Sequence, residues 1–329
     1  MNAKCIRFYE FGSPEDVLKV EYQSITHPKE NEVLVRMLTR PINPSDLIPI
    51  SGAYSHRIAL PMIPGYEGVG VVEAIGPVVS KNLIGQRVLP LRGEGTWQEF
   101  VKTSAPFAVP IPDSIDNVSA AQLYINPITA WVICREVLIL KPNDWLLVNA
   151  CGSAIGHIFA QLAKILGFRL IAVTRDDTYT DVLLGLGASQ VIDTSKMPLY
   201  ETVMTLTNGM GATAAIDSIG GRDGDDLAFC VRPNGQFSTI GLLSGVPVNW
   251  ANIVNKAKVN VKMFHLRHWN KNVSADQWQR TFKSIIKLVE TQQLRLMKPN
   301  SQYDLLDVKK AVKSVKRSRG KVFLTSSLR

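Results

Sequence analysis

Residues 144–156 combine the features of a phosphate-binding turn. An apolar run, 144–150, is long enough for one buried strand, and small residues follow it. Apolar residues then recur at helical spacing until Gly167, which predicts a helix that ends there. Small residues between a strand and a helix let backbone N–H groups and the helix N-terminus approach a pyrophosphate. The residues expected to line the pyrophosphate of a dinucleotide are Gly152, Ser153, Ala154 and Ile155.

A second apolar run, residues 169–175, ends in a positively charged residue, Arg175. In a strand-turn-helix-strand unit this position meets the adenosine ribose of a bound dinucleotide. NAD binders tend to place Asp or Glu here, whereas a cation suits the 2′-phosphate of NADP, so we expect NADPH as the cofactor. The turn departs from G-x-G-x-x-G, because Ala150 and Ser153 stand where glycines are usual. An α/β unit that binds no dinucleotide is the alternative interpretation.

The elements around this unit predict an α/β chain with two domains. Further short strands are expected at 188–193, 214–220 and 235–241, separated by helices, which indicates a doubly wound parallel sheet of the Rossmann type. Ligands of such sheets lie at the carboxyl ends of the strands, so Gly241 and Leu242 are expected near the nicotinamide.

The first part of the chain has a different texture. Short strand-like runs at 32–38, 68–76 and 85–90 alternate with Pro and Gly, which predicts a compact, barrel-like β domain. Near the C-terminus we expect helices near 275–290 and 305–316 and a last strand at 321–324.

Composition limits the classes of protein that fit. The chain has 329 residues, of which 46% are hydrophobic and 20% charged, as in globular domains. No apolar run spans a bilayer, the N-terminus lacks a signal-type apolar region, and the four cysteines lack metal or redox spacing, so we expect a cytoplasmic location without membrane contact. The net charge of +9 fits a dinucleotide, CoA or an acidic carrier protein, although excess surface lysine explains it equally well. The basic residues are dispersed, which disfavours nucleic acid.

Taken together, these segments resemble the medium-chain dehydrogenase/reductase superfamily. That superfamily joins a GroES-like β-barrel domain to a Rossmann domain, which implies a catalytic domain of residues 1–118 and 263–329 and a dinucleotide-binding domain of residues 119–262. Its zinc enzymes have a cysteine ligand where this chain has Asn43, and G-H-E where this chain has Gly65-Tyr66-Glu67. Because neither Asn43 nor Tyr66 suits zinc, the chain resembles a zinc-independent branch and no metal is expected.

Within that branch the chain is similar to mitochondrial-type 2-enoyl thioester reductases. The matching motifs, in chain order, are 43–46 (N-P-S-D), 52–54 (G-x-Y), 95–97 (G-T-W), 126–130 (N-P-x-T-A) and 175–176 (R-D). Departures at His265 and Arg267, where the family usually has uncharged residues, leave the acyl pocket and the substrate open. Related NADPH:quinone reductases share the fold and the loss of zinc, so they are the alternative.

The resemblance also implies roles for single residues. Tyr54 would be the catalytic residue, since a phenol of pKa about 10 stays protonated and can donate to a developing oxyanion. The remaining implied contacts are to the cofactor for Asn126, Phe264, Leu266 and Lys321, and to the substrate pocket for Asn43 and Trp269. Three of them have a structural alternative: a capped Asn-Pro turn for Asn126, core packing for Phe264, and a core or interface anchor for Trp269.

The sequence therefore predicts an NADPH-dependent, metal-free reductase of the activated C=C bond of 2-enoyl thioesters. A quinone reductase is the first alternative, and a non-catalytic NADPH-binding sensor is the second. Tyr54 argues against a sensor, which needs no proton donor. The expected partners are a small molecule or an acyl thioester of CoA or acyl carrier protein, and a homodimer is expected by family analogy.

Overall fold

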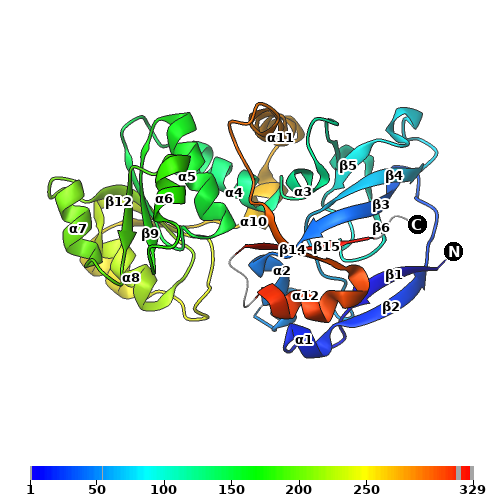
Figure 1. Cartoon of the computed structure of the whole chain (residues 1–329), viewed down its shortest axis with the longest axis horizontal. Helices are drawn as coiled ribbons and strands as arrows, with labels where there is room; N and C mark the ends of the chain where they lie inside the picture. Colours follow the sequence, from blue (N-terminus) through cyan, green and yellow to red (C-terminus); the bar gives the residue numbers. More distant parts are fainter. Residues whose placement is uncertain (1, 54, 316–319, 327–329) are drawn as a thin grey trace. The chain divides into compact units, whose positions relative to one another are not determined.

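The computed structural model describes residues 2–53, 55–315 and 320–326. Contacts divide the chain into two compact units (Figure 1). Unit 1 comprises residues 1–125 and 296–329, and unit 2 comprises residues 126–295. The sequence-based boundaries, after residues 118 and 262, differ from this division. Residues 263–295 pack with unit 2, where Glu136 accepts hydrogen bonds from Trp269 Nε1 and Gln277 Nε2.

Unit 2 is built on a six-stranded parallel sheet with the strand order β10-β9-β8-β11-β12-β13. In sequence order within the unit this is 3-2-1-4-5-6, the order of a dinucleotide-binding doubly wound fold. The predicted α/β fold class with a parallel sheet is confirmed. The strands are β8 (Trp145–Val148), β9 (Arg169–Thr174), β10 (Gln190–Asp193), β11 (Ala212–Asp217), β12 (Val231–Thr239) and β13 (Asn260–Met263).

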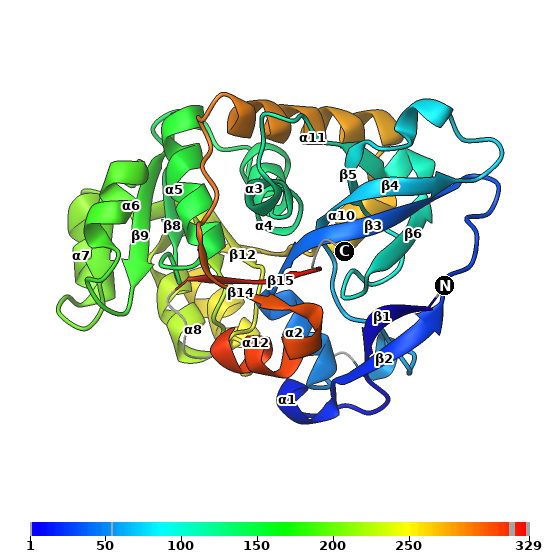
Figure 2. The same cartoon turned by 45° about the vertical axis from the view of Figure 1, so that its right-hand side comes forward.

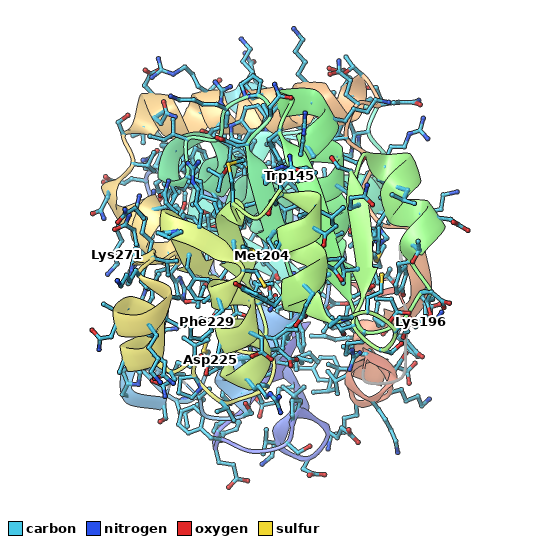
Figure 3. The ribbon with its side chains drawn as sticks, turned by 90° about the vertical axis from the view of Figure 1, so that its left-hand side faces the viewer. Trp145, Lys196, Met204, Asp225, Phe229 and Lys271 are labelled. Carbon is cyan, nitrogen blue, oxygen red and sulfur yellow. The ribbon has the colours of Figure 1, made fainter. Side chains whose placement is uncertain are left out.

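Helices of unit 2 cover this sheet, and Figure 3 shows one face, with Met204 and Phe229 labelled. Leu147, Ile171 and Phe237 of the strands pack with Val203 and Leu227 of the helices in one buried core. The central strands β8 and β9 are buried along most of their length, and their sequences are mostly apolar, as expected of a parallel sheet covered on both faces. The helices are α4 (Ile125–Val132, which begins at the last residue of unit 1), η4 (Ile133–Val137), α5 (Ala154–Leu166), α6 (Thr180–Leu186), α7 (Leu199–Leu206), α8 (Gly221–Phe229), α9 (Trp250–Asn252), η5 (Ile253–Ala257), α10 (Leu266–Asn272) and α11 (Ala275–Glu290).

Unit 1 contains a seven-stranded sheet with the order β14-β15-β3-β4-β5-β7, in which β6 also pairs with β3. The described pairings run as an open path from β14 to β7, so they do not by themselves close a barrel. Strands β1 and β2 form a separate antiparallel pair. The strands are β1 (Asn2–Arg7), β2 (Lys19–Ser24), β3 (Glu32–Pro41), β4 (Val69–Ile75), β5 (Arg87–Pro90), β6 (Phe100–Ser104), β7 (Ala108–Pro110), β14 (Pro299–Asp304) and β15 (Lys321–Thr325).

The C-terminal strand completes this sheet. β15 lies parallel to β14 and antiparallel to β3, with Phe323 opposite Pro41 (Figure 2). This pairing places Lys321 next to residues from near position 43, far away in sequence. The helices of unit 1 include α1 (Pro14–Val17), α2 (Pro44–Ile50), α3 (Asn117–Ala120) and α12 (Val308–Val315). Within the described residues, no helix has the length and apolar character needed to cross a membrane.

Candidate active site

The turn after β8 brings helix α5 very close to the backbone. Ala150 adopts a left-handed φ of +51°, a conformation in which glycine is more usual. A Cβ added at Gly156 would lie 2.3 Å from the carbonyl oxygen of Cys151, so only glycine fits there without a shift of the backbone. A Cβ at Gly152 would lie 2.6 Å from the ring of Tyr179. Ala150 therefore departs from the G-x-G-x-x-G pattern, whereas Gly156, where a Cβ would clash with the backbone, keeps its glycine.

Helix α5 begins directly after this turn. Ser153 is the N-cap, and its Oγ accepts a hydrogen bond from Gly156 N–H at 3.4 Å. The first-turn amides of Ala154 and Ile155 have no intrahelical acceptor. A 13-residue helix therefore presents amide N–H groups and the positive end of its dipole at the position predicted for the pyrophosphate.

A pair of buried side chains holds the carboxyl ends of β8 and β11 together. Asn149 Nδ2 donates to Asp217 Oδ1 at 2.6 Å, and Asn149 Oδ1 accepts from Ser218 N–H at 2.8 Å. Asp217 also accepts from the N–H groups of Ile219 and Gly220. These strands flank the point where the strand order reverses, so the pair positions the edge at which doubly wound sheets bind ligands. Neither Asn149 nor Asp217 was predicted from the sequence as a functional residue.

The other cofactor candidates of unit 2 lie at the same edge of the sheet. Arg175 directly follows β9 and is exposed. Gly241 follows β12, and an added Cβ there would approach Ser218 O to 2.8 Å. Leu242 is 38% exposed, which leaves it accessible to a ligand. Phe264 follows β13, is half-buried and donates its N–H to Thr239 O.

Helix α10 holds the remaining candidates near the end of β13. Leu266 is its first residue and is half-buried. Trp269 is also half-buried, and its Nε1 donates to Glu136 Oε2 at 2.9 Å. That bond ties the indole to η4, as expected of a structural anchor. His265 is the N-cap, and its Nδ1 accepts from Arg267 N–H.

Unit 1 places Asn43 and Lys321 in one buried network. Lys321 Nζ donates to Asn43 Oδ1, and Asn43 Nδ2 donates to Glu67 Oε1 at 2.7 Å. Asp46 Oδ2 accepts from Asn43 N–H at 2.8 Å, and Asp46 Oδ1 accepts from Tyr66 N–H at 3.2 Å. Lys321 is 6% exposed and Asn43 1%, so their side chains face each other and not solvent. Sequence reasoning missed Asp46 and Glu67, although both stand in motifs that it quoted.

Burial dominates the electrostatics of this network. Desolvation raises the pKa of Asp46 to about 7, against the hydrogen bond from Asn43 N–H, and also raises the pKa of Glu67. Desolvation lowers the pKa of Lys321, although Glu67 and Asp46 oppose that shift. Glu67 Oε2 further accepts the N–H groups of Tyr124 and Ile125. One ammonium lies near two carboxyl groups, so the charge state of each group affects the pKa values of the other two.

The last two candidates are Asn126, in α4, and Tyr54. Asn126 is half-buried and is the second residue of α4, directly after the segment that Glu67 holds. Tyr54 lies outside the described residues, between Gly52, with a φ of +93°, and the short helix η1 (Ser55–Arg57). Its catalytic role remains a prediction. Among the described residues no group of three or more His, Cys, Asp or Glu side chains could hold a metal ion.

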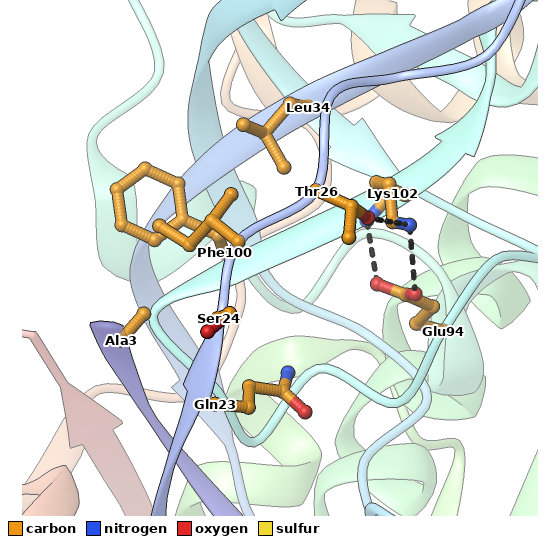
Figure 4. Close-up of a pocket in the computed structure, with 9 residues that line it drawn as sticks. Ala3, Gln23, Ser24, Thr26, Leu34, Glu94, Phe100 and Lys102 are labelled. Atoms are coloured by element: carbon orange, nitrogen blue, oxygen red, sulfur yellow. Dashed lines mark hydrogen bonds and ion pairs between the residues drawn. The ribbon is translucent and has the colours of Figure 1, made fainter. Parts of the chain in front are cut away.

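A cavity of about 210 Å³ lies elsewhere in unit 1, against β1, β2, β3 and β6 (Figure 4). Lys102 Nζ donates there to Thr26 Oγ1 at 2.7 Å and lies 3.8 Å from Glu94 Oε1. None of the candidate residues lines this cavity, so it is not part of the candidate active site.

Comparison with known families matches both units. The family model of the alcohol dehydrogenase GroES-like domain matches residues 29–113, and that of the zinc-binding dehydrogenase matches residues 154–288. The mitochondrial enoyl-[acyl-carrier-protein] reductase of Mus musculus is 32% identical over 295 residues, which cover 88% of this chain and 79% of the relative.

Two solved structures extend the comparison. A crystal structure from Bacillus thuringiensis, whose description proposes an NADPH:quinone reductase, is 68% identical with a TM-score of 0.98, over 99% of this chain and 100% of that chain. The mitochondrial 2-enoyl thioester reductase heterodimer from Candida tropicalis is 26% identical with a TM-score of 0.87, over 99% and 100% of the two chains.

Proposed function

This chain belongs to the medium-chain dehydrogenase/reductase superfamily, and on that premise we propose that it is an NADPH-dependent, zinc-independent reductase of the activated C=C bond of 2-enoyl thioesters. The observation that carries the proposal is the edge of the unit 2 sheet. The N-terminus of α5, the glycine-dependent turn and Arg175 lie there together, in the arrangement that a phosphorylated dinucleotide needs.

At the adenosine end, the chain would bind and orient the cofactor. The amides of Ala154 and Ile155 would face the pyrophosphate, and the guanidinium of Arg175 would pair with the 2′-phosphate. Gly241 and Leu242, which follow β12, would line the nicotinamide end of the same edge. When bound, the nicotinamide supplies a hydride to the β carbon of the substrate.

Residues of unit 1 would act on the acceptor. Negative charge develops on the thioester carbonyl oxygen as the β carbon is reduced, and a donor that is already in place stabilises it. Tyr54 is proposed as that donor and as a source of the proton for the α carbon. Lys321 was expected to contact the cofactor, but its ammonium is engaged with Asn43, so we assign it to the buried network instead. Asn43 is buried and holds the side chains of Lys321 and Glu67 in place, so we assign it to the network and not to the lining of the substrate pocket.

A quinone reductase is the second candidate function. The 68% identity to the Bacillus thuringiensis protein favours it, because that description names a quinone substrate. His265 and Arg267 also favour a different substrate, since they stand where enoyl reductases usually have uncharged residues. A non-catalytic sensor has no such observation in its support.

Turnover assays decide between the two enzymes. NADPH oxidation is followed by absorbance with crotonyl-CoA and with 1,4-benzoquinone, each over a range of concentrations. A kcat/KM for crotonyl-CoA well above that for the quinone supports the enoyl reductase. The reverse order supports the quinone reductase. If neither substrate is turned over, the result supports the non-catalytic sensor.

The assembly is also a proposal. β13 is the last strand of the unit 2 sheet, so one of its edges has no neighbour among the described strands. An unpaired edge is a template for pairing with a second copy, and we propose a homodimer formed there. Size-exclusion chromatography with light scattering tests it. A cytoplasmic location also remains a prediction.

A further inference from the structure

Charged side chains from two neighbouring strands meet at the adenosine end of the unit 2 edge. β9 and β10 are parallel neighbours, and Thr174 lies opposite Asp193 where both strands end. Thr194 N–H donates to Thr174 O at 3.0 Å, which keeps the segments that follow the two strands side by side. Arg175 follows the first strand and Lys196 follows the second, so two cations leave the sheet at adjacent points.

Lys196 is held by two carboxylates. Its Nζ pairs with Asp177 Oδ2 and lies 3.5 Å from Asp193 Oδ2. The other oxygen of Asp193 holds this side chain in place: Oδ1 accepts hydrogen bonds from Ser195 N–H at 2.9 Å and from Ser195 Oγ at 2.7 Å. Asp177 is less constrained: its side chain is 67% exposed, and that of Lys196 is 61% exposed. Lys196 lies at the periphery of unit 2 in Figure 3, where a ligand can reach it.

We propose that Lys196 is a second cation for the 2′-phosphate of the cofactor, beside Arg175, and that Asp177 acts as a replaceable counter-ion for it. The inference rests on the proposed NADPH-dependent function. A 2′-phosphate carries close to two negative charges, and one guanidinium does not neutralise it. Lys196 would turn from Asp177 to the phosphate and keep Asp193 as its second partner.

The charged groups around Lys196 include more anions than cations, so Asp177 can be replaced as the partner of Lys196 without leaving the lysine unpaired. The region holds the cations Arg175 and Lys196 and the anions Asp176, Asp177 and Asp193. An ion pair between exposed groups is weak, so a phosphate dianion competes with Asp177 at little cost. Asp177 would also repel the phosphate, so this position sets how strongly NADPH is preferred.

The test uses 2′,5′-ADP and 5′-AMP, which differ by the 2′-phosphate alone, together with NADPH and NADH. Dissociation constants are measured by isothermal titration calorimetry for the wild-type protein, Lys196→Met and Asp177→Asn. Lys164→Met is the matched control, because it removes the same charge from an exposed site in the last turn of α5. Lys196→Met is expected to weaken 2′,5′-ADP and NADPH roughly five- to twentyfold and to leave 5′-AMP and NADH unchanged. Asp177→Asn is expected to tighten 2′,5′-ADP about two- to fivefold.

The two proposals fail in different ways. If the wild-type protein binds NADH and NADPH equally, the proposed NADPH dependence is wrong. If the wild-type protein prefers NADPH but Lys196→Met keeps the wild-type ratio, Lys196 has no role and Arg175 suffices. Equal losses for 5′-AMP and 2′,5′-ADP would show damage to the whole adenosine site and would overturn the assignment of Lys196 to the phosphate.

Discussion

The edge of the unit 2 sheet and the buried network of unit 1 hold candidate residues in opposite ways. At the edge, backbone amides and glycines form the site, and the charged side chains, Arg175 and Lys196, are exposed. In the network, the ionisable side chains of Asp46, Glu67 and Lys321 are buried, and each is hydrogen-bonded to Asn43. A ligand can neutralise exposed charges, whereas buried charges have to be neutralised by the protein.

This difference predicts what a substitution does in each region. A side chain lost from the exposed edge should weaken ligand binding and leave the fold intact. A side chain lost from the network should destabilise the fold, because its partners stay buried without compensation.

Lys321→Met should lower the free energy of unfolding by about 3–5 kcal/mol, since it leaves Glu67 and Asp46 without the ammonium that faces them. Urea unfolding followed by circular dichroism measures it. The control Lys313→Met removes an exposed charge from α12 and should change stability by less than about 0.5 kcal/mol. Adding Glu67→Gln to Lys321→Met should restore part of the loss. Equal stability of Lys321→Met and Lys313→Met would contradict the network.

Tyr54→Phe should reduce kcat by ~10²-fold or more and leave the Kd for NADPH unchanged. The hydroxyl is proposed to act on charge that develops only in the transition state, so binding in the ground state should not depend on it. Tyr22→Phe, at a 61% exposed side chain of unit 1, is the control. Steady-state kinetics with crotonyl-CoA give the result. A Tyr54→Phe enzyme within a few-fold of the wild type would make Tyr54 a structural residue.

Local sequence patterns predicted most of the unit 2 sheet and its edge. Helix α5 has Ser153 as its N-cap and ends at Gly167, with a φ of +80°, because capping and glycine conformations depend on neighbouring residues alone. The helix expected near 275–290 has those bounds, with Ser274 as its cap. Strand β13 was not predicted, since its four residues are mostly exposed and have no apolar period.

The buried network could not be predicted in the same way. Asn43 and Lys321 are separated by 278 positions, and their contact depends on the pairing of β15 with β3. The resemblance to known reductases placed both residues at a site but gave no information on their burial. The boundary expected after residue 262 differs from the structure for a similar reason, because the bonds of Glu136 to Trp269 and Gln277 join distant segments.

Arg175→Ala should raise the Kd for NADPH about ten- to a hundredfold and change the Kd for NADH little. The guanidinium is proposed to bind the 2′-phosphate, which NADH lacks. Arg222→Ala removes an exposed arginine of α8 and is the control. The thermal unfolding temperature should be unchanged in both variants, because both arginines are exposed. An unchanged preference for NADPH in Arg175→Ala would remove its assigned role.

The smallest expected effect is a pH dependence of stability caused by Asp46. Burial raises its pKa from 3.8 to about 7 in the folded protein, so between these pH values the folded state holds a proton that the unfolded state has released. The contribution of Asp46 to stability is therefore present below about pH 4 and is lost as the pH rises to about 7. Relative to the wild type, Asp46→Asn should gain roughly 2 kcal/mol in unfolding free energy between pH 5 and pH 7.

Urea unfolding at several pH values measures that difference, with Asp113→Asn, at a fully exposed carboxylate of unit 1, as the control. The comparison is made between pH values within each variant, because the amide introduced by Asp46→Asn accepts one fewer hydrogen bond than the carboxylate and lowers stability at every pH. Parallel pH curves for Asp46→Asn and the wild type would show that Asp46 is ionised at pH 5. Asp46 would then stay ionised beside Lys321 across this range, and the network would resemble the exposed edge in its response to pH.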